Sequence, residues 1–524
     1  MYSVYICILL LLSIHLKYAC AQEDARVALE NGIFKGFKKH GLYQFLGVPY
    51  AAPPVKDLRF RPPQPPARSN RLNRATKFGP MCPQLLPIPY LMDEDCLTLN
   101  VWTPDMTPDN LYPVMVWVFG GTYEFGDSHM YNGEGFVRKT GNSVVLVSVN
   151  FRSNIFGYFA TEAGIKEGAA NIQLNDQQFA LEWVQKNIHL FGGNPNDVTL
   201  FGESSGAGAI ALHLLMYHNS TSRPFHKAII MSAGPTTMIG DVRYYQSVLD
   251  KVVRRLGCTS SDSTKLIECM QKIPWPVLLS TYRLIRGPVE LLISRVPTSP
   301  IVDGVLLPMK PEDMLKEGFI SPIPILSGIT TNEASLFMMV IYNPFRDWIQ
   351  VLRGIIPGIQ EQDIKKLSTY YPKNQYSSAY ARAVELISDI VFKCPEHLLA
   401  KYAISTHYRY RFNQETVLLK LGPRPLHAAH ALDLAYLWPD TLIFKPLTMV
   451  FTKRDWILSK EIINYWVCFA KTGNPNCEDQ LEWPDYTTTR KRIVLQEPGL
   501  GLELDPVNIM DEKCDFINYL RSKY

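Results

Sequence analysis

The segment VTLFGESSG, residues 198–206, indicates the fold of the whole chain. Its first four residues form an apolar run typical of a buried strand, and the next five fit the pattern G-x-S-x-G around Ser204. Helical spacing follows over Ala207 to Tyr217. A strand, this pentapeptide and a helix in sequence predict a sharp turn called a nucleophile elbow. We therefore expect Ser204 to project as a nucleophile and the backbone N–H of Ser205 to point toward an oxyanion.

Further apolar runs alternate with helical segments along the chain. Continuous runs of this kind are typical of strands that are buried on both faces. The predicted strands are residues 113–119, 143–151, 228–232, 323–326 and 408–412, and a further helix is predicted over 176–187. The alternation predicts the α/β class, with a large, mostly parallel central sheet and helices on both faces. No repeat or long linker interrupts the pattern, so residues 22–524 are expected to form one domain.

Composition excludes several classes of protein. Of 524 residues, 47% are hydrophobic and 19% are charged, which is far from the composition of disordered, collagen-like or coiled-coil chains. The formal charge of +4 arises from 53 basic and 49 acidic residues that are spread along the chain. We therefore expect no nucleic-acid partner.

The amino terminus reads as a secretory leader. Residues 4–12 (VYICILLLL) form a short apolar core, and Ala19-Cys20-Ala21 is a small-x-small cleavage pattern. The run is shorter than the roughly 20 residues that a membrane span needs, and no later stretch approaches that length. We therefore predict a signal peptide over residues 1–21 and an extracellular mature chain without a membrane span. A signal anchor is the alternative, because no Lys or Arg precedes the apolar run.

Secretion would allow the eight remaining cysteines to pair. Spacing suggests Cys82 with Cys96 and Cys258 with Cys269, and it leaves the other four open: Cys394, Cys468, Cys477 and Cys514. No C-x-x-C or H-E-x-x-H pattern predicts a metal site. The sequon at Asn219 is a glycosylation site compatible with secretion.

An elbow serine needs an acid and a histidine, which follow it in that order in this kind of fold. Two histidines, His427 and His430, lie in the loop-like stretch GPRPLHAAHALDLAYLW after the predicted strand 408–412. Glu333 follows the predicted strand 323–326 and its turn, and so lies at the carboxyl end of a strand. Position alone leaves the choice of histidine open, and it does not distinguish Glu333 from a surface carboxylate.

The chain resembles the type-B carboxylesterase and cholinesterase family of α/β-hydrolases over almost its whole mature length. Three stretches carry the resemblance: the serine signature at residues 191–206, the second signature EDCLTLNVWTP at 94–104, and the N-terminal block FLGVPYAAPPVKDLRFRPP at 45–63. The resemblance implies a serine carboxylic-ester hydrolase without a cofactor, with Ser204 as nucleophile, Glu333 as triad acid and His430 as base. It also implies a disulfide between Cys394 and Cys514, which leaves Cys468 and Cys477 free or paired with each other.

In this family a glycine-rich loop forms the oxyanion hole, and here Phe119-Gly120-Gly121-Thr122-Tyr123 occupies it. The resemblance assigns the hole to backbone N–H groups of Gly121, Thr122 and Ser205. Thr122 departs from the usual Gly or Ala, and its β-branched side chain is expected to narrow the acyl side. Small to medium esters are therefore the expected substrates.

Three other functions stay open. Cholinesterases of the family place a Trp in the loop that corresponds to residues 82–96 to bind a quaternary ammonium group, but here Tyr90 is the only aromatic residue. We therefore favour a general carboxylesterase over a choline-ester hydrolase. The other two are a lipase, and a non-catalytic adhesion or binding protein of the kind that the family also contains.

Overall fold

The computed structural model describes residues 25–85, 91–107, 109–286, 298–341, 348–356, 358–415, 426–441, 443–477, 480–497 and 499–524. The predicted signal peptide at residues 1–21 lies outside this part of the chain. In the described ranges, no helix has both the length and the apolar character that a bilayer crossing requires.

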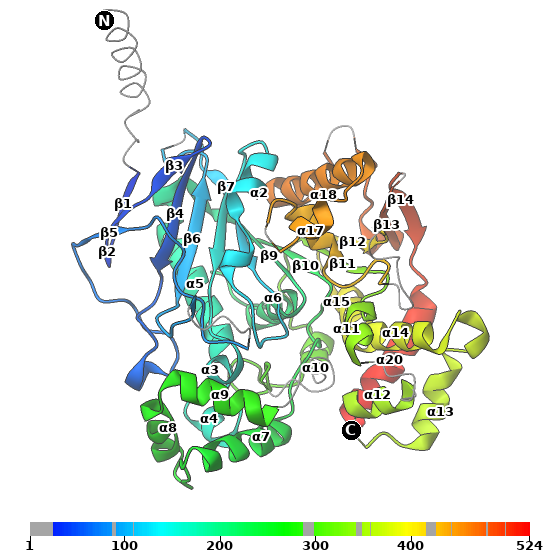
Figure 1. Cartoon of the computed structure of the whole chain (residues 1–524). Coiled ribbons are helices and arrows are strands. Elements are labelled where there is room, and N and C mark those ends of the chain that lie inside the picture. The colour runs from blue at the N-terminus through cyan, green and yellow to red at the C-terminus, as the bar shows by residue number, and fades with distance from the viewer. Residues whose placement is uncertain are drawn as a thin grey trace, which may run out of the picture.

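A sheet of eleven strands organises the molecule (Figure 1). In spatial order the strands are β14 (Gly501–Leu504), β13 (Lys491–Leu495), β12 (His407–Phe412), β11 (Ile325–Thr330), β10 (Lys227–Met231), β9 (Gly193–Glu203), β7 (Tyr112–Val118), β8 (Val145–Val149), β6 (Thr98–Thr103), β4 (Leu42–Pro49) and β3 (Phe37–Lys39). Neighbouring strands from β13 to β8 run parallel, and the outer pairs run antiparallel. A smaller sheet contains β1 (Arg26–Leu29), β2 (Gly32–Lys35) and β5 (Leu72–Arg74).

The predicted α/β architecture, with a large and mostly parallel central sheet, is confirmed. Every residue of β8, β10 and β11 is buried, which explains why their sequences are continuous apolar runs without alternation. The helix α5 (Ile172–Asn187) begins four residues earlier than predicted and ends at the predicted residue. The helix α6 (Ser205–Met216) begins directly after the elbow.

Helices cover both faces of the sheet (Figure 1). The helices α5, α6 and α15 (Cys394–Tyr402) contact β9, β10 and β11, whereas α2 (Gly133–Lys139) and α18 (Lys453–Thr472) contact β6 to β9. The shorter helices are α3 (Asn154–Gly157), α4 (Glu162–Lys166), α10 (Pro311–Lys316), α11 (Ser335–Ile341), α16 (Leu432–Leu437), α17 (Lys445–Thr448) and α19 (Tyr486–Thr489).

Two groups of helices lie at the edge where the parallel strands end (Figure 1). The first contains α7 (Val242–Arg255), α8 (Ser263–Lys272) and α9 (Trp275–Arg286). The second contains α12 (Trp348–Ile355), α13 (Glu361–Thr369), α14 (Ala379–Ser388) and the C-terminal α20 (Val507–Lys523). Each group has a hydrophobic cluster of its own, separate from the main core around the sheet.

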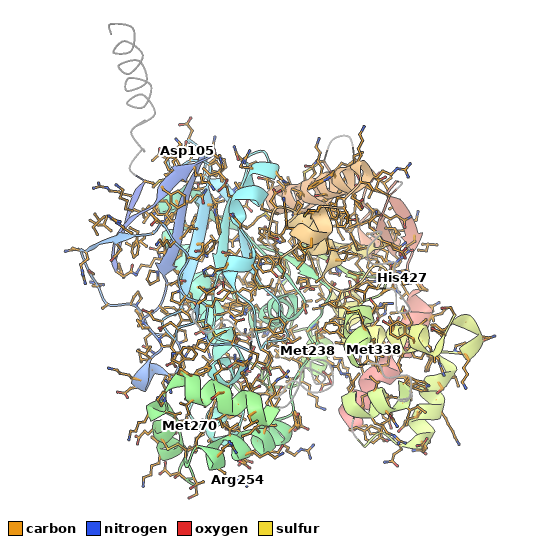
Figure 2. All side chains as sticks on the ribbon, viewed as in Figure 1. Asp105, Met238, Arg254, Met270, Met338 and His427 are labelled. Atoms are coloured by element: carbon orange, nitrogen blue, oxygen red, sulfur yellow. A yellow bond between two sulfur atoms is a disulfide. The ribbon has the colours of Figure 1, made fainter. Side chains whose placement is uncertain are left out.

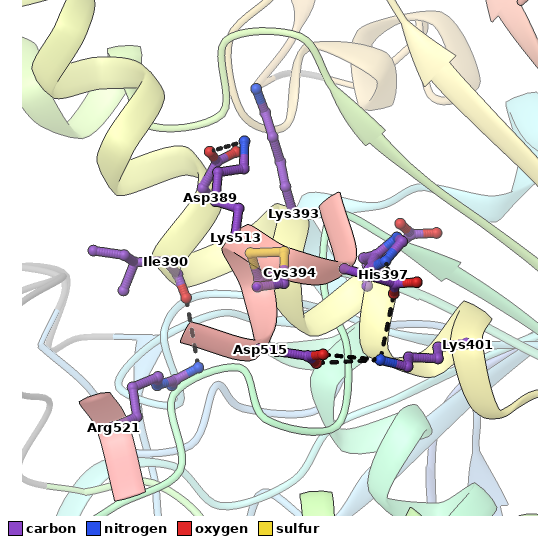
Figure 3. Close-up of a disulfide and its surroundings, with 12 residues drawn as sticks. Asp389, Ile390, Lys393, Cys394, His397, Lys401, Lys513, Asp515 and Arg521 are labelled. Atoms are coloured by element: carbon purple, nitrogen blue, oxygen red, sulfur yellow. Dashed lines mark hydrogen bonds and ion pairs between the residues drawn. A yellow bond between two sulfur atoms is a disulfide. The ribbon is translucent and has the colours of Figure 1, made fainter. Parts of the chain in front are cut away.

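Four disulfides join the cysteines of the described chain. Cys82 bonds to Cys96 and Cys258 to Cys269, as the spacing suggested, and each of these bonds closes a local loop. Cys394 bonds to Cys514 across a separation of 120 residues and so ties α20 to α15 (Figure 3). The remaining two, Cys468 and Cys477, are paired with each other.

A buried ion-pair cluster holds β12 against its neighbours. The guanidinium of Arg409 on β12 binds the Glu396 carboxylate of α15, with Nε 2.9 Å from Oε1, and it also contacts the carboxylate of Asp505. The Ser327 hydroxyl on β11 donates to the same Glu396 oxygen at 2.5 Å. All four side chains are buried, so their polar groups must form hydrogen bonds and ion pairs with one another because water does not reach them.

We expect Arg409→Met to lower the free energy of unfolding by about 3–5 kcal/mol, because Glu396 and Asp505 would lose their shared buried cation. Urea unfolding followed by fluorescence measures this loss. The control is Lys316→Met, which removes an exposed ion pair with Asp313 and should cost less than about 1 kcal/mol. Equal effects of the two substitutions would contradict the account.

Candidate active site

The turn after β9 places Ser204 in a constrained backbone conformation. Its φ of 55° and ψ of −129° are unfavourable for a residue with a side chain, and two hydrogen bonds hold it there. Its N–H donates to the Met231 carbonyl at 2.9 Å, and its carbonyl accepts from the Gly208 N–H at 2.8 Å. The serine side chain therefore stands at the carboxyl end of β9, as the elbow motif predicts.

The two glycines of the motif are required by one close approach. A Cβ atom on Gly202 would lie 2.6 Å from the Val118 carbonyl oxygen, and one on Gly206 would lie 2.2 Å from the same oxygen. Neither distance is sterically possible against backbone. The turn can therefore pack against the end of β7 only with glycine at both positions.

One histidine connects the serine to a carboxylate. His430 Nε2 lies 2.9 Å from Ser204 Oγ, and His430 Nδ1 lies 2.6 Å from Glu333 Oε2. The other Glu333 oxygen accepts the Thr330 N–H at 2.6 Å. Ser204 is 4% exposed, His430 is 6% exposed and Glu333 is fully buried. The three residues that the sequence singled out thus meet, although they come from the ends of different strands.

Backbone contacts fix the histidine loop against the turn that carries Glu333. Asn332 forms a bridge with Ala429, and the Asn332 N–H donates to the Ala428 carbonyl at 2.9 Å. His427, the alternative that the sequence left open, has its Nδ1 2.8 Å from Glu415 Oε1 and is 41% exposed on its side chain (Figure 2). The structure therefore brings His430, and not His427, to Ser204.

Two further carboxylates lie near the imidazole. Glu203 Oε1 is 3.1 Å from His430 Nε2, and Asp433 Oδ2 accepts the Tyr410 hydroxyl at 2.9 Å. Burial raises the pKa of Glu203 to about 8 and that of Asp433 to about 6. Burial opposes the charged form of His430, but Glu203 and Glu333 outweigh it and raise the pKa of the imidazole. Glu203 and Glu333 therefore stabilise a positive charge on the imidazole.

Aromatic rings close the other side of the imidazole. The ring centroid of Phe392 lies 4.4 Å from that of His430, and the centroid of Phe337 lies 5.2 Å away. Phe392 belongs to η7 (Asp389–Lys393), a π-helical turn between α14 and α15. Neither ring, nor Asp433, is among the site residues expected from the sequence. No local pattern could have done so, because only the tertiary fold brings them to His430.

The glycine-rich loop packs directly on the serine. A Cβ atom on Gly120 would lie 2.9 Å from Ser204 Cβ, and the next three residues all have positive φ, with 55° at the β-branched Thr122. In the described chain, the N–H groups of Gly121 and Thr122 donate no hydrogen bond. The Ser205 N–H begins α6, where N–H groups lack helical partners. These three N–H groups, two in the loop that packs on Ser204 and one in the residue that follows Ser204, therefore have no backbone acceptor among the described residues and are free to bind a ligand atom.

The chain is similar to known proteins in both sequence and fold. The model of the carboxylesterase family matches residues 23–500. The chain is 31% identical to an acetylcholinesterase of Bungarus fasciatus, over 91% of this chain and 83% of the relative, and 30% identical to carboxylesterase 1C of Mus musculus, over 84% and 83%. A solved carboxylesterase structure from Geobacillus stearothermophilus superposes with a TM-score of 0.79 at 28% identity, covering 93% of this chain and 99% of that one. The chain therefore belongs to the carboxylesterase family and is a carboxylic ester hydrolase.

Proposed function

We propose that the protein hydrolyses small to medium carboxylic esters through an acyl-enzyme on Ser204, with His430 as general base and Glu333 as the acid that orients it. The hydrogen-bonded chain from Ser204 Oγ through the imidazole to Glu333 is the observation that carries the proposal. An isolated serine hydroxyl is too weakly acidic to attack an ester at neutral pH, so it needs a base at this distance.

In the first half of the reaction, His430 Nε2 takes the proton of Ser204 as Oγ attacks the ester carbonyl carbon. The carbonyl oxygen becomes an oxyanion, which the N–H groups of Gly121, Thr122 and Ser205 stabilise. The imidazolium then donates its proton to the leaving alcohol, and the acyl group remains on Ser204. Glu333 keeps Nδ1 protonated and stabilises the positive charge on the ring.

In the second half, His430 deprotonates a water molecule that attacks the acyl carbon, and the proton returns to Ser204 Oγ as the carboxylate leaves. Every atom that is transferred comes from the ester, the water or these side chains, so the proposed cycle uses no cofactor. The burial of the triad strengthens each electrostatic contribution, because bulk water does not screen it.

The substrate range rests on two features of the sequence. The loop between Cys82 and Cys96 has no Trp to hold a quaternary ammonium group, which supports general esters over choline esters. Thr122 carries a branched and buried side chain, 3% exposed, in the loop that packs on Ser204, and this supports a limit on the size of the acyl group. An intact triad argues against a purely adhesive role.

We further propose that the mature enzyme is secreted. The four disulfides and the exposed position of Asn219 in its sequon support an oxidising, glycosylating route.

Ser204→Ala should lower kcat for p-nitrophenyl butyrate by about 10⁴-fold or more, because no other group can carry the acyl intermediate. Ser205→Ala is the matched control. It removes only the hydroxyl that accepts the Tyr123 N–H at 3.2 Å and keeps the backbone donor, so we expect a loss of less than about tenfold. Acetylthiocholine serves as second substrate and should be hydrolysed poorly. Equal rates for wild type and Ser204→Ala would favour the binding-protein alternative, and a preference for the choline ester would contradict the substrate assignment.

Glu203→Gln should move the acidic limb of the kcat/KM profile to lower pH, by about one pH unit. The base must be neutral to accept a proton, so activity is lost as pH falls through the pKa of His430. The Glu203 carboxylate raises that pKa, and its removal therefore lowers it. The measurement is the rate of p-nitrophenyl butyrate hydrolysis between pH 5 and pH 9. An acidic limb that stays in place or moves upward would show that Glu203 does not act on the imidazole.

Thr122→Gly should raise the rate for p-nitrophenyl benzoate relative to the butyrate by about tenfold, since the acyl side widens. Glycine also tolerates the positive φ at this position without strain. Thr122→Val keeps the branched shape and should leave the ratio of the two rates unchanged. If valine and glycine gave the same ratio, the size of residue 122 would not set the acyl preference.

A further inference from the structure

A cavity of about 390 Å³ lies apart from Ser204, between the start of α7, α10, η7 and the end of α20. Apolar side chains form much of its wall: Met238, Ile239, Ile355, Ile356, Ile390 and Val391. In Figure 2 the labelled Met238 lies in the region between the two groups of helices. The volume falls within the range of small-molecule sites.

A cation without an ionic partner also lines this cavity. Arg521 in the last turn of α20 donates to two backbone carbonyls, with Nη2 2.7 Å from the Thr236 oxygen and Nη1 3.5 Å from the Ile390 oxygen. A guanidinium has five N–H donors, so most of its capacity is left over. Within the described ranges, no carboxylate lies within ion-pair distance of Arg521.

Two other carboxylates, on α20 and η7, are already engaged by other cations. Asp515 of α20 is bound by Lys401 at 3.2 Å, and Asp389 of η7 is bound by Lys513 at 2.5 Å (Figure 3). Burial lowers the pKa of Arg521, and the more distant charge of Glu312 only partly offsets this effect. Keeping a partly buried guanidinium charged without an ionic partner costs free energy, and an anion that binds it would lower that cost.

The surroundings favour an anion with an apolar tail. Two exposed basic residues, Arg243 and Lys310, line the same cavity, and so do two acidic residues, Asp241 and Glu312. The carboxylate of Asp241 is already engaged, because it caps α7 and lies 3.6 Å from the Arg243 guanidinium. A bare inorganic anion would leave the isoleucine-rich wall unfilled. A carboxylate matches the flat fork of the free guanidinium donors, and an alkyl chain matches the wall.

We propose that this cavity binds an amphipathic organic carboxylate, with Arg521 holding the carboxylate group and the apolar wall holding its chain. The cavity is separate from the catalytic triad, so this site does not depend on the proposed mechanism. It is nevertheless adjacent to the triad, because Ile390 and Val391 precede Phe392, whose ring lies against His430. A π-helical turn such as η7 is a frequent feature of functional sites.

The test is calorimetric titration of sodium decanoate, below its micelle concentration, into full-length enzyme whose Ser204 has been blocked with phenylmethylsulfonyl fluoride. Blocking keeps the probe out of the active site and separates this result from the proposed reaction. We expect decanoate to bind and Arg521→Met to weaken its binding by about tenfold or more, while Arg521→Lys, which keeps the charge but not the fork, should show a smaller loss. Decanol, which has the same chain without the charge, should not distinguish wild type from Arg521→Met.

Unblocked Arg521→Met should keep its hydrolysis of p-nitrophenyl butyrate, which shows that the variant is folded. If Arg521→Met does not fold, decanoate binding to Glu312→Gln is measured in its place. Removal of this negative charge beside the cavity should tighten decanoate binding several-fold. No binding to the blocked wild type, unchanged affinity in Arg521→Met, or unchanged affinity in Glu312→Gln would each overturn the proposal.

Discussion

The close packing of the turn at residues 202–206 against the Val118 carbonyl is the constraint on which the rest of the site depends. It requires glycine at both ends of the turn and forces Ser204 into a conformation that only a rigid surrounding can hold. The same strand end continues into the glycine-rich loop, so the loop and the serine are positioned by one contact. The serine and its backbone donors are therefore set before any substrate arrives.

The imidazole is positioned by a second, independent contact. The bridge between Asn332 and Ala429 ties the histidine loop to the turn of Glu333, and it brings together residues almost a hundred positions apart in the sequence. Buried carboxylates lie around the imidazole ring of His430. The free-energy cost of burying them is offset in part by their attraction to the positively charged imidazolium. The site is thus suited to the positive charge that the proposed reaction places on His430.

The sequence predicted the features that depend on neighbours in the chain. Apolar runs identified the central strands, and the elbow motif located Ser204 together with the helix that follows it. Boundaries were less accurate: β9 begins at Gly193, five residues before the predicted start, because Gly193 pairs with Tyr112 before an irregularity shifts the register. The edge strands β13 and β14 were not predicted.

Features that depend on distant contacts could not be predicted in the same way. Nothing local distinguishes His430 from His427, since the choice is made by a bridge to another loop. Spacing likewise left Cys394 and Cys514 open, and only the resemblance to the family paired them. The positions of Phe392 and Asp433 near His430 depend on tertiary packing, and so does the cavity at Arg521, which forms only when several helices pack together.

The most direct test of the central claim is mass spectrometry of the protein after reaction with a p-nitrophenyl alkylphosphonate, which reacts with an activated serine and releases p-nitrophenolate. We expect one stoichiometric adduct, located on Ser204 by peptide mapping, and no adduct in the His430→Ala variant. An adduct on Ser205, or equal labelling of wild type and His430→Ala, would contradict the proposal that Ser204 is activated by the imidazole beside it.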